Sequence, residues 1–361
     1  MASIIDYSLL TLNSDEARET SQAVFKRAFL SPDLTEVHNV QTGADMDRYI
    51  PIFGRLGLVG KADPGGCNVN SIIGGIPVSQ KQWTPKLISG RIEHCEADIP
   101  KLLKMWKQNR IAANLWEGID NEAAAFVEDQ ALTSVKESII RITEFAATNH
   151  SPVGDATGDQ NLTSGTDKTY FNVLNGMWAQ IEADAALAPN NKIYRYTISE
   201  NAGANKNAQL NLAADAALNV FRALYGNIPS QAFASGNLVI QCTRSLFNNW
   251  VDYLETQSLG FTLTRAEQGN VSRWSYRGIP IVVRYDWDVI IRTYFDTGTT
   301  YYLPHRAILA DINTIPIGTS DEESLTRLDS FYDRVSKKHF IDFAYRIDCK
   351  VLDEDLIAVA F

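Results

Sequence analysis

The chain has 361 residues, of which 45% are hydrophobic and 21% charged, and it contains 22 glycines and 12 prolines. These fractions exclude a collagen-like, disordered or low-complexity chain, and the length predicts more than one packing unit because single cores stop growing at about 250–300 residues. With 33 basic and 43 acidic residues the formal net charge is −10. This charge argues against a dedicated nucleic-acid-binding protein, which needs a basic surface to hold phosphates.

The compartment is predicted from what the sequence does not contain. No stretch approaches the roughly 18 apolar residues of a membrane span, and the segment Met1–Asp6 lacks the features of a signal peptide. The four cysteines lie far apart with no CxxC pair, which favours reduced thiols over a disulfide framework. They are Cys67, Cys95, Cys242 and Cys349. We therefore expect a cytosolic, globular protein.

The first hundred residues contain few helical signals. A short helix is predicted from Ser14, a suitable N-cap, to the stop at Pro32. From Thr35 to Ile99 the sequence is rich in Gly and Pro, with short β-prone pieces and no helical period. Because a structureless loop of that length is unusual inside a compact domain, the segment predicts an extended arm or projecting hairpin that finds its partners outside its own domain.

One long helix stands out in the middle of the chain. A short helix is predicted at Asp98–Gln108, and then Asp120–Asn149 contains neither Gly nor Pro. Apolar residues recur there at helical spacing, which predicts one buried stripe on a rod roughly 45 Å long. The stripe is Leu132, Val135, Ile139, Ile142 and Phe145. The predicted outward face carries Glu128, Asp129, Lys136, Glu137, Arg141 and Glu144. A loop is predicted at Ser151–Lys168.

The second half alternates helices and strands, which makes the class α+β. Helices are predicted at 171–181, 210–224 and 245–256, and strands at 238–240, 261–264, 272–276, 279–284 and 289–294. From Ile341 to Val351 apolar and polar residues alternate strictly, which predicts a long half-buried strand. The chain is then expected to turn at Asp353–Asp355 and return as the strand Leu356–Phe361.

No catalytic, cofactor-binding or metal-binding residues are assigned, because each candidate motif fails on its chemistry. The glycines of Gly54–Ala62 lack the spacing and the Ser or Thr of a phosphate loop. His94 and Cys95 would point to opposite faces of a strand, and the five histidines never fall at ligand spacing. The acidic groups 321–323 and 353–355 are expected to be solvated loops. We therefore predict a protein that is not an enzyme and has no cofactor.

The order of these elements resembles the major capsid proteins of tailed bacteriophages with the Hong Kong 97 capsid fold. Two strings add to the resemblance, Trp274–Arg284 and Pro304–Asn313 with Ile317-Gly318. The resemblance implies five successive parts. They are an N-terminal arm at 1–55, an E-loop hairpin at 56–97, a P-domain with its spine helix at 98–168, an A-domain at 169–295, and a return to the P-domain with C-terminal strands at 296–361.

The resemblance also implies a function and partners. The chain would assemble as pentamers and hexamers into the icosahedral head shell that encloses packaged double-stranded DNA, without sequence-specific binding and without a membrane. It would form in the host bacterial cytoplasm and reside in the virion, with a portal protein and decoration proteins as further partners. Because the arm-like segment comes almost at once, scaffolding is expected from a separate protein.

Two alternatives, and one chemical feature of some relatives, accompany this interpretation. An encapsulin-like nanocompartment has the same fold but holds cargo enzymes. A hydrolase built on acidic loops, for instance around Asp286 and Asp288, lacks a paired histidine or nucleophile. Some relatives crosslink their shell through an E-loop lysine. Lys61, Lys81 and Lys86 lie in the corresponding region, but the sequence identifies neither the Asn nor the Glu that the crosslink would need.

Overall fold

The computed structural model describes residues 37–44, 48–54, 75–76, 78–95, 119–186, 193–257, 265–268, 271–320, 325, 329–333, 335 and 338–361. The helices predicted at 14–32 and 98–108 and the strand predicted at 261–264 lie outside these residues. The described strands form a five-stranded sheet, a seven-stranded sheet and a separate two-stranded hairpin.

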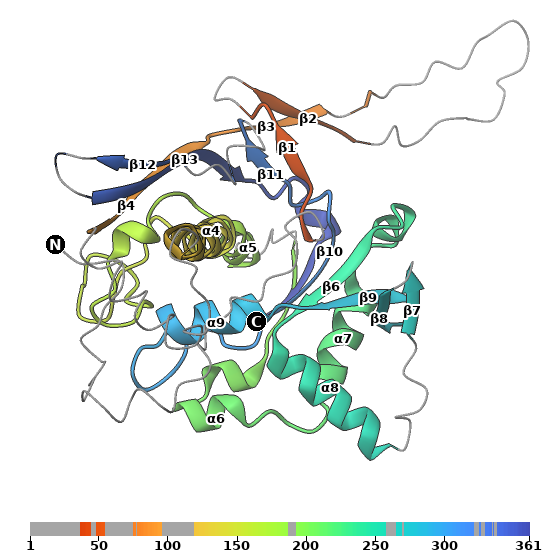
Figure 1. Ribbon diagram of the computed structural model, residues 1–361. Coiled ribbons are helices and arrows are strands. Elements are labelled where there is room, and N and C mark those ends of the chain that lie inside the picture. The colour runs from red at the N-terminus through yellow and green to blue at the C-terminus, as the bar shows by residue number, and fades with distance from the viewer. Residues whose placement is uncertain are drawn as a thin grey trace, which may run out of the picture.

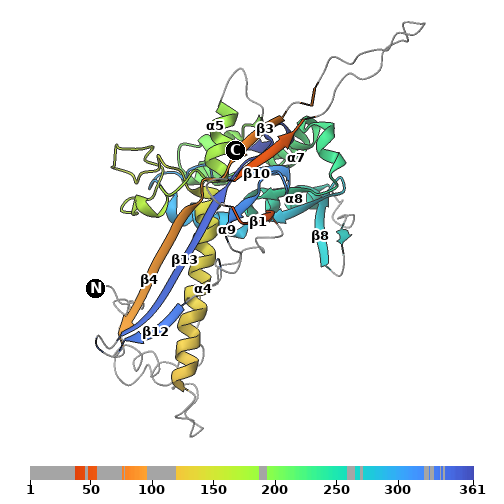
Figure 2. The same ribbon diagram turned by 90° about the horizontal axis from the view of Figure 1, so that it is seen from above.

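The long helix α4 (Ile119–Phe145) lies along the five-stranded sheet (Figure 2). The central strand β13 (Lys338–Cys349) pairs antiparallel with β4 (Lys86–Cys95) over almost its whole length. Its other edge carries β12 (Asp329–Asp333) and β11 (Ile317–Thr319), and β1 (Val40–Thr42) continues parallel to β11. Helix and sheet together make an elongated body.

The predicted stripe and the predicted long strand face each other across this body. Val135, Ile139, Ile142 and Phe145 of α4 are buried, as their spacing predicted. On β13, Ile341, Tyr345 and Ile347 are buried while Ala344 and Arg346 are exposed. The hydroxyls of Ser138 and Tyr345 lie 2.7 Å apart and join the two elements. The helix and its stripe are confirmed, although Leu132 is only half-buried and α4 ends at Phe145, before the predicted Asn149. The alternation of the strand is confirmed up to Ile347, whereas Asp348, predicted on the polar face, is buried and accepts the Thr84 amide.

The seven-stranded sheet is buried on both faces at its centre. Its order is β5 (Tyr194–Tyr196), β14 (Ala358–Ala360), β10 (Ala307–Asp311), β6 (Leu238–Cys242), β9 (Ile279–Val283), β8 (Val271–Tyr276) and β7 (Arg265–Gln268). Ile308 and Val359 point into the core shared with α4, whereas Leu309 and Ala358 point into a second core. Burial on both faces explains why the central strands β6, β10 and β14 are mainly apolar instead of alternating.

Helices cover the two faces of this sheet (Figure 1). α5 (Met177–Ala186) and α9 (Tyr285–Tyr294) contribute to the core shared with α4, and α7 (Ala216–Asn227) and α8 (Arg244–Thr256) to the second core. The short helix α6 (Lys206–Leu210) completes the α-helices among the described residues. Among the described residues, the 3-10 helices are Lys168–Tyr170, Ser199–Ala202, Ser230–Ala234 and Glu354–Leu356.

The segment 289–294 forms part of the helix α9, so the predicted strand is wrong. Its β-branched residues favour a strand locally, but Trp287, Ile290 and Ile291 are buried together on one helical face. Asp286 and Asp288 occupy the first turn, where acidic residues suit the helix dipole. Tertiary packing therefore outweighs the local preference.

Two other helices begin later than predicted. Phe171, Leu174 and Trp178 are buried as expected, but α5 starts only at Met177, because Gly176 lies against the end of α4. A Cβ on Gly176 would come within 2.8 Å of the Thr143 carbonyl oxygen. Further on, α7 starts at Ala216, while Leu210 ends the separate helix α6.

The projecting hairpin consists of β2 (Tyr49–Phe53) and β3 (Val78–Gln82), paired antiparallel. The following strand β4, which the sequence analysis assigned to the hairpin, pairs with β13 instead. Strands β10 and β14, assigned to the segment returning to the P-domain, join the seven-stranded sheet. Strand pairing over such sequence separations leaves no local signal.

Among the described helices, none is long and apolar enough to cross a membrane.

Candidate assembly surfaces and their anchoring

The hairpin exposes one apolar face. In the antiparallel register Tyr49 lies opposite Gln82 and Phe53 lies opposite Val78, so these side chains share a face. Tyr49 is 51% exposed, Phe53 69% and Val78 61%. A two-stranded hairpin has no core of its own and is marginal in water by itself, and Figure 1 shows β2 and β3 at the edge of the molecule. An exposed apolar face in this position is suited to contact another chain.

The root of the hairpin is packed firmly against the body. Trp83, directly after β3, is only 2% exposed. Its ring lies over Gly318 of β11, where a Cβ would come within 2.7 Å of the indole. The Trp83 amide donates to the Arg48 carbonyl oxygen at 3.1 Å and so ties both ends of the hairpin together. Glycine at 318 is what allows this close approach.

Polar contacts reinforce the same root. The Lys81 ammonium donates to the Glu354 carboxylate and to the Val351 carbonyl oxygen. Next to it, the Thr84 amide donates to Asp348 Oδ2 at 2.7 Å, and Lys350 Nζ donates to the Thr84 hydroxyl at 2.9 Å. The hairpin is therefore held by the C-terminal segment on one side and by β11 on the other.

These contacts place two of the three lysines considered for crosslinking. Lys81 is engaged at the hairpin root, and Lys86 is exposed at the start of β4. Lys61 lies outside the described residues. The acidic turn 353–355, predicted to be a solvated loop, supplies Glu354 to Lys81, and its Asp353 side chain accepts from the Asp355 amide. The other acidic group, 321–323, lies outside the described residues.

A cluster of charged side chains lies fully buried between the two sheets. The Arg284 guanidinium, at the end of β9, donates to both carboxylate oxygens of Glu144 at 2.7 and 2.8 Å. It also donates to Asp286 Oδ2 at 2.5 Å and to Gln241 Oε1 at 2.6 Å. The Trp287 indole donates to Glu144 at 2.5 Å. One guanidinium therefore joins α4, β6 and the start of α9.

The first described segment of the chain is bound to the same cluster. His38 Nε2 lies 2.9 Å from Glu144 Oε1, and its Nδ1 lies 2.9 Å from the Ile315 carbonyl oxygen. Both partners are acceptors, so both hydrogen bonds form together only when the imidazole carries two protons. His38 therefore links this segment to the end of α4 and to the backbone at Ile315.

Burial and ion pairing act in opposite directions on these groups. Burial alone would raise the pKa of Glu144, but Arg284 and His38 outweigh it and hold that pKa below its usual range. Burial raises the pKa of Asp286 in spite of the opposing effect of Arg284. For Arg284, burial would lower the pKa, but the two carboxylates raise it, so the guanidinium stays charged.

The placement of Glu144 corrects the sequence analysis, which put it on the outward face of the long helix. Its side chain is 0% exposed, because His38, Arg284 and Trp287 pack around it at the end of α4. Glu137 on the same predicted face is only half-buried and accepts a hydrogen bond from the Tyr294 hydroxyl at 3.0 Å. The apolar stripe of a helix predicts which side packs on the nearest sheet. It does not predict that other parts of the chain also bury the opposite side at the end of the helix.

The remaining candidate groups do not form a reactive centre in the described part of the chain. Cys242 and Cys349 are free and buried, and burial raises the pKa of both thiols. His305 Nδ1 lies 2.6 Å from the Ser245 hydroxyl, and burial lowers the pKa of this histidine. No three His, Cys, Asp or Glu side chains among the described residues gather as metal ligands.

Comparison with known proteins identifies the fold through structure and not through sequence. No protein-family model matches the chain, and no curated protein matches it significantly. A solved structure from Gordonia phage Cozz matches with a TM-score of 0.51 and 15% identity, covering 98% of this chain and 91% of that one.

Two structures described as capsids align over similar lengths. The capsid of Myoviridae phage XM1 gives a TM-score of 0.46 at 12% identity, covering 95% of each chain. The procapsid of satellite phage P4, which includes the size determination protein, gives 0.44 at 11% identity, covering 90% of this chain and 92% of that one. Because both values lie below 0.5, the fold is assigned on the match to the Gordonia phage structure. The chain has the Hong Kong 97-like capsid fold.

Proposed function

We propose that this chain is the major capsid protein of a tailed double-stranded DNA bacteriophage and assembles into the icosahedral head shell around the packaged genome. The observation that carries the proposal is the hairpin β2–β3, which is anchored at its root and exposes Tyr49, Phe53 and Val78 on one face. A subunit of a closed shell repeats the same contact around each ring. An anchored, projecting apolar face is suited to such a contact.

The elements correspond to the parts that the resemblance implied, with changed boundaries. In this proposal the E-loop is the hairpin 49–82, and the P-domain consists of α4 with β4, β12 and β13. The A-domain consists of the seven-stranded sheet with α7 and α8. The buried cluster around Arg284 lies where these two domains meet and ties the segment at His38 to both.

Assembly as pentamers and hexamers, a portal protein, a separate scaffolding protein and decoration proteins follow from the same proposal. The protein would then reside in the virion after assembly in the host bacterial cytoplasm. The formal net charge of −10 is compatible with a container, because a shell that held DNA tightly would hinder packaging and release.

The hydrolase alternative is less well supported by the geometry of its acidic residues. The Asp286 carboxylate is buried and engaged by Arg284. Asp288 Oδ2 accepts the Arg244 amide at 2.8 Å at the start of α8. Both carboxylates therefore have structural partners. The encapsulin-like alternative has the same fold and differs only in what the shell encloses.

Electron microscopy of the purified full-length chain tests the proposal. We expect hollow closed particles, or rings of five and six subunits, under assembly conditions with or without a scaffolding protein. The double variant Phe53→Ser/Val78→Ser should keep the melting temperature of the unassembled subunit and lose particle formation. The matched control is Val335→Ser, which changes a 93% exposed valine outside the hairpin and should still assemble.

Two results would contradict the proposal. One is a homogeneous monomer under every condition tried, and the other is normal particles from the hairpin double variant. Particles isolated from an infected host that contain a cargo protein in place of DNA would favour the encapsulin-like alternative.

A further inference from the structure

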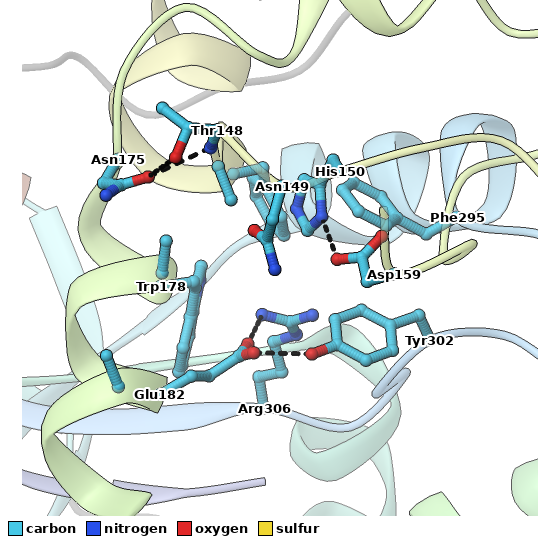
Figure 3. A pocket seen from close by; sticks show the side chains of 14 residues that line it. Thr148, Asn149, His150, Asp159, Asn175, Trp178, Glu182, Phe295, Tyr302 and Arg306 are labelled. Atoms are coloured by element: carbon cyan, nitrogen blue, oxygen red, sulfur yellow. Dashed lines mark hydrogen bonds and ion pairs between the residues drawn. The ribbon is translucent and has the colours of Figure 1, made fainter. Parts of the chain in front are cut away.

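A cavity of about 350 Å³ lies between the loop after α4, helix α5 and the segment before β10, away from the hairpin (Figure 3). Its walls include Phe145, Trp178, Phe295 and Tyr302, and its polar lining includes Asn149, His150, Asp159, Glu182 and Arg306. Its hydrogen-bonding capacity is strongly one-sided.

Arg306 provides most of the unused donors. The residue is 1% exposed, and its guanidinium lies against three aromatic rings, those of Phe145, Trp178 and Tyr302. Its Nε donates to the Leu303 carbonyl oxygen at 2.9 Å and its Nη1 to Glu182 Oε1 at 3.1 Å. A guanidinium has five N–H donors, so the remaining donors, including both on Nη2, have no acceptor within the described part of the chain.

The two carboxylates of the cavity, in contrast, are already occupied on both oxygens. Glu182 receives Arg306 on one oxygen and the Tyr302 hydroxyl on the other at 2.5 Å. Asp159 receives His150 Nδ1 at 2.6 Å on one oxygen and the backbone amides of Ser151 and Asn161 on the other. A cation would therefore have to displace existing bonds, whereas an acceptor would complete unfinished ones.

The buried indole N–H of Trp178 has no hydrogen-bond partner among the described residues, and the same holds for two polar groups on the loop after α4. One is the Asn149 side chain, which Figure 3 shows directly above the Arg306 guanidinium. The other is the second ring nitrogen of His150, whose first nitrogen is used by Asp159. Buried polar groups are normally satisfied, so a buried arginine with open donors calls for a partner that the described part of the chain does not supply.

We propose that this cavity binds a small carboxylate group, with the Arg306 guanidinium and the Asn149 carboxamide as its donors. A carboxylate offers two oxygens in one plane, which match the parallel N–H bonds of a guanidinium. The aromatic rings hold the guanidinium in place, so little side-chain entropy is lost on binding. The inference does not rest on the proposed shell function.

Two kinds of molecule can supply this carboxylate group. One is a free dicarboxylate of the succinate class, and the other is an Asp or Glu side chain of a second copy of this chain. If a second copy supplies it, succinate should bind the unassembled subunit, slow assembly, and fail to bind finished particles. If the ligand is free, finished particles should bind succinate as the subunit does.

Calorimetric titration of the unassembled full-length chain tests the site with succinate, acetate and neutral acetamide at matched ionic strength. We expect saturable binding of succinate and acetate, with acetamide at least tenfold weaker. Asn149→Leu should weaken succinate binding at least fivefold. The matched control Asn248→Leu changes an exposed asparagine in a different cavity, beside α8, and should leave binding unchanged.

Arg306→Gln should abolish binding, with circular dichroism to confirm that the variant folds. If this variant does not fold, the Asn149→Leu comparison still decides the question, because Asn149 is exposed. The proposal is overturned if no carboxylate binds saturably, if acetamide binds as well as acetate, or if Asn149→Leu binds succinate like the unchanged chain.

Discussion

Arg284 is the centre of one buried cluster of charged side chains, and two of its partners, Glu144 and Gln241, come from distant parts of the chain. Removing charged side chains from water costs free energy that their mutual attraction offsets only when geometry and hydrogen bonding are good. Here Glu144, Asp286, Gln241 and Trp287 all have specific contacts in the cluster. Such a cluster makes the arrangement of α4, β6 and α9 specific, because any other arrangement would leave a buried charge without its partner.

Replacing Glu144 by Gln tests this account. The variant keeps the shape of the side chain but leaves Arg284 without one of its two carboxylates, so we expect a loss of about 3–5 kcal/mol in the free energy of unfolding. Urea denaturation of the unassembled subunit measures it. The matched control Glu137→Gln lies on the same helix, keeps an acceptor for the Tyr294 hydroxyl, and should change stability by less than about 1 kcal/mol. Equal effects of the two changes would contradict the account.

Asp288 predicts a pH dependence of stability. Burial raises the pKa of this carboxyl to about 6, although the Arg244 amide acts against the shift. The folded state therefore favours the protonated form. The stabilisation is fully present below the unfolded pKa of 3.8 and is lost as the pH rises through about 6. A shift of this size corresponds to roughly 1–3 kcal/mol.

The Asp288→Asn variant should lack this dependence. Its unfolding free energy relative to the unchanged chain should rise by roughly 1–3 kcal/mol between pH 3.5 and pH 7, measured by urea denaturation at each pH. Asp252→Asn, an exposed aspartate beside the same cavity, serves as the control and should follow the unchanged chain. Parallel pH curves for Asp288→Asn and the unchanged chain would show that burial does not raise the pKa of Asp288.

At the scale of elements, α4 and β13 form the elongated body that carries the hairpin root. Ile139 lies in the middle of the buried stripe and is 5% exposed, whereas Lys136 on the same helix is exposed. Ile139→Asp would bury an unpaired carboxylate, which costs several kcal/mol even after relaxation. We therefore expect loss of soluble subunit for Ile139→Asp, measured as soluble yield and melting temperature.

Lys136→Asp introduces the same side chain on the same helix at a solvent-facing position. Surface changes of this kind usually alter stability by less than about 0.5 kcal/mol, so this variant should remain soluble and melt close to the unchanged chain. If both variants were tolerated equally, the packing face of α4 would be assigned wrongly.

The hairpin depends on its surroundings more than on its own strands. Its root is fixed by Trp83 over Gly318 and by Lys81 on Glu354, whereas β2 and β3 contact mainly each other. A deletion meant to remove the hairpin must therefore stop before Trp83, because continuing into β4 would remove the strand that pairs with β13. This boundary separates the part expected to act in assembly from the part needed for folding.

At the scale of the whole molecule, the seven-stranded sheet joins two hydrophobic cores, because β10 and β14 send alternate side chains to opposite faces. The molecule is acidic as a whole, with a formal net charge of −10. Electrostatic attraction to phosphates supplies most of non-specific DNA binding. We therefore expect the unassembled subunit to bind double-stranded DNA more weakly than the roughly 10⁻⁴–10⁻⁶ M typical of non-specific binding proteins at physiological salt.

Filter binding at 50 and 200 mM salt measures this affinity. A basic DNA-binding protein run beside the subunit shows the steep salt dependence that phosphate contacts produce. A comparable salt dependence for the subunit would show that it has a basic surface in spite of its negative net charge. The expectation that the shell encloses DNA without binding it tightly would then be wrong.

The sequence by itself determined those features that depend on local periodicity. The stripe Leu132–Phe145 predicted the long helix, and the alternation from Ile341 to Val351 predicted β13, because burial of one face imposes a period of 3.6 or 2 on neighbouring residues. The absence of short catalytic motifs, together with the order of the elements, also came from the sequence.

Only the tertiary structure decided features that join residues far apart. Glu144 pairs with Arg284 across 140 positions and Lys81 with Glu354 across 273, and no local pattern encodes either contact. The segment 289–294 has a strand-forming composition but is helical, because Trp287 and Ile290 pack into a core built from α4 and α5. Burial by distant elements changes what a local sequence prefers, and it is established only when the whole chain has folded.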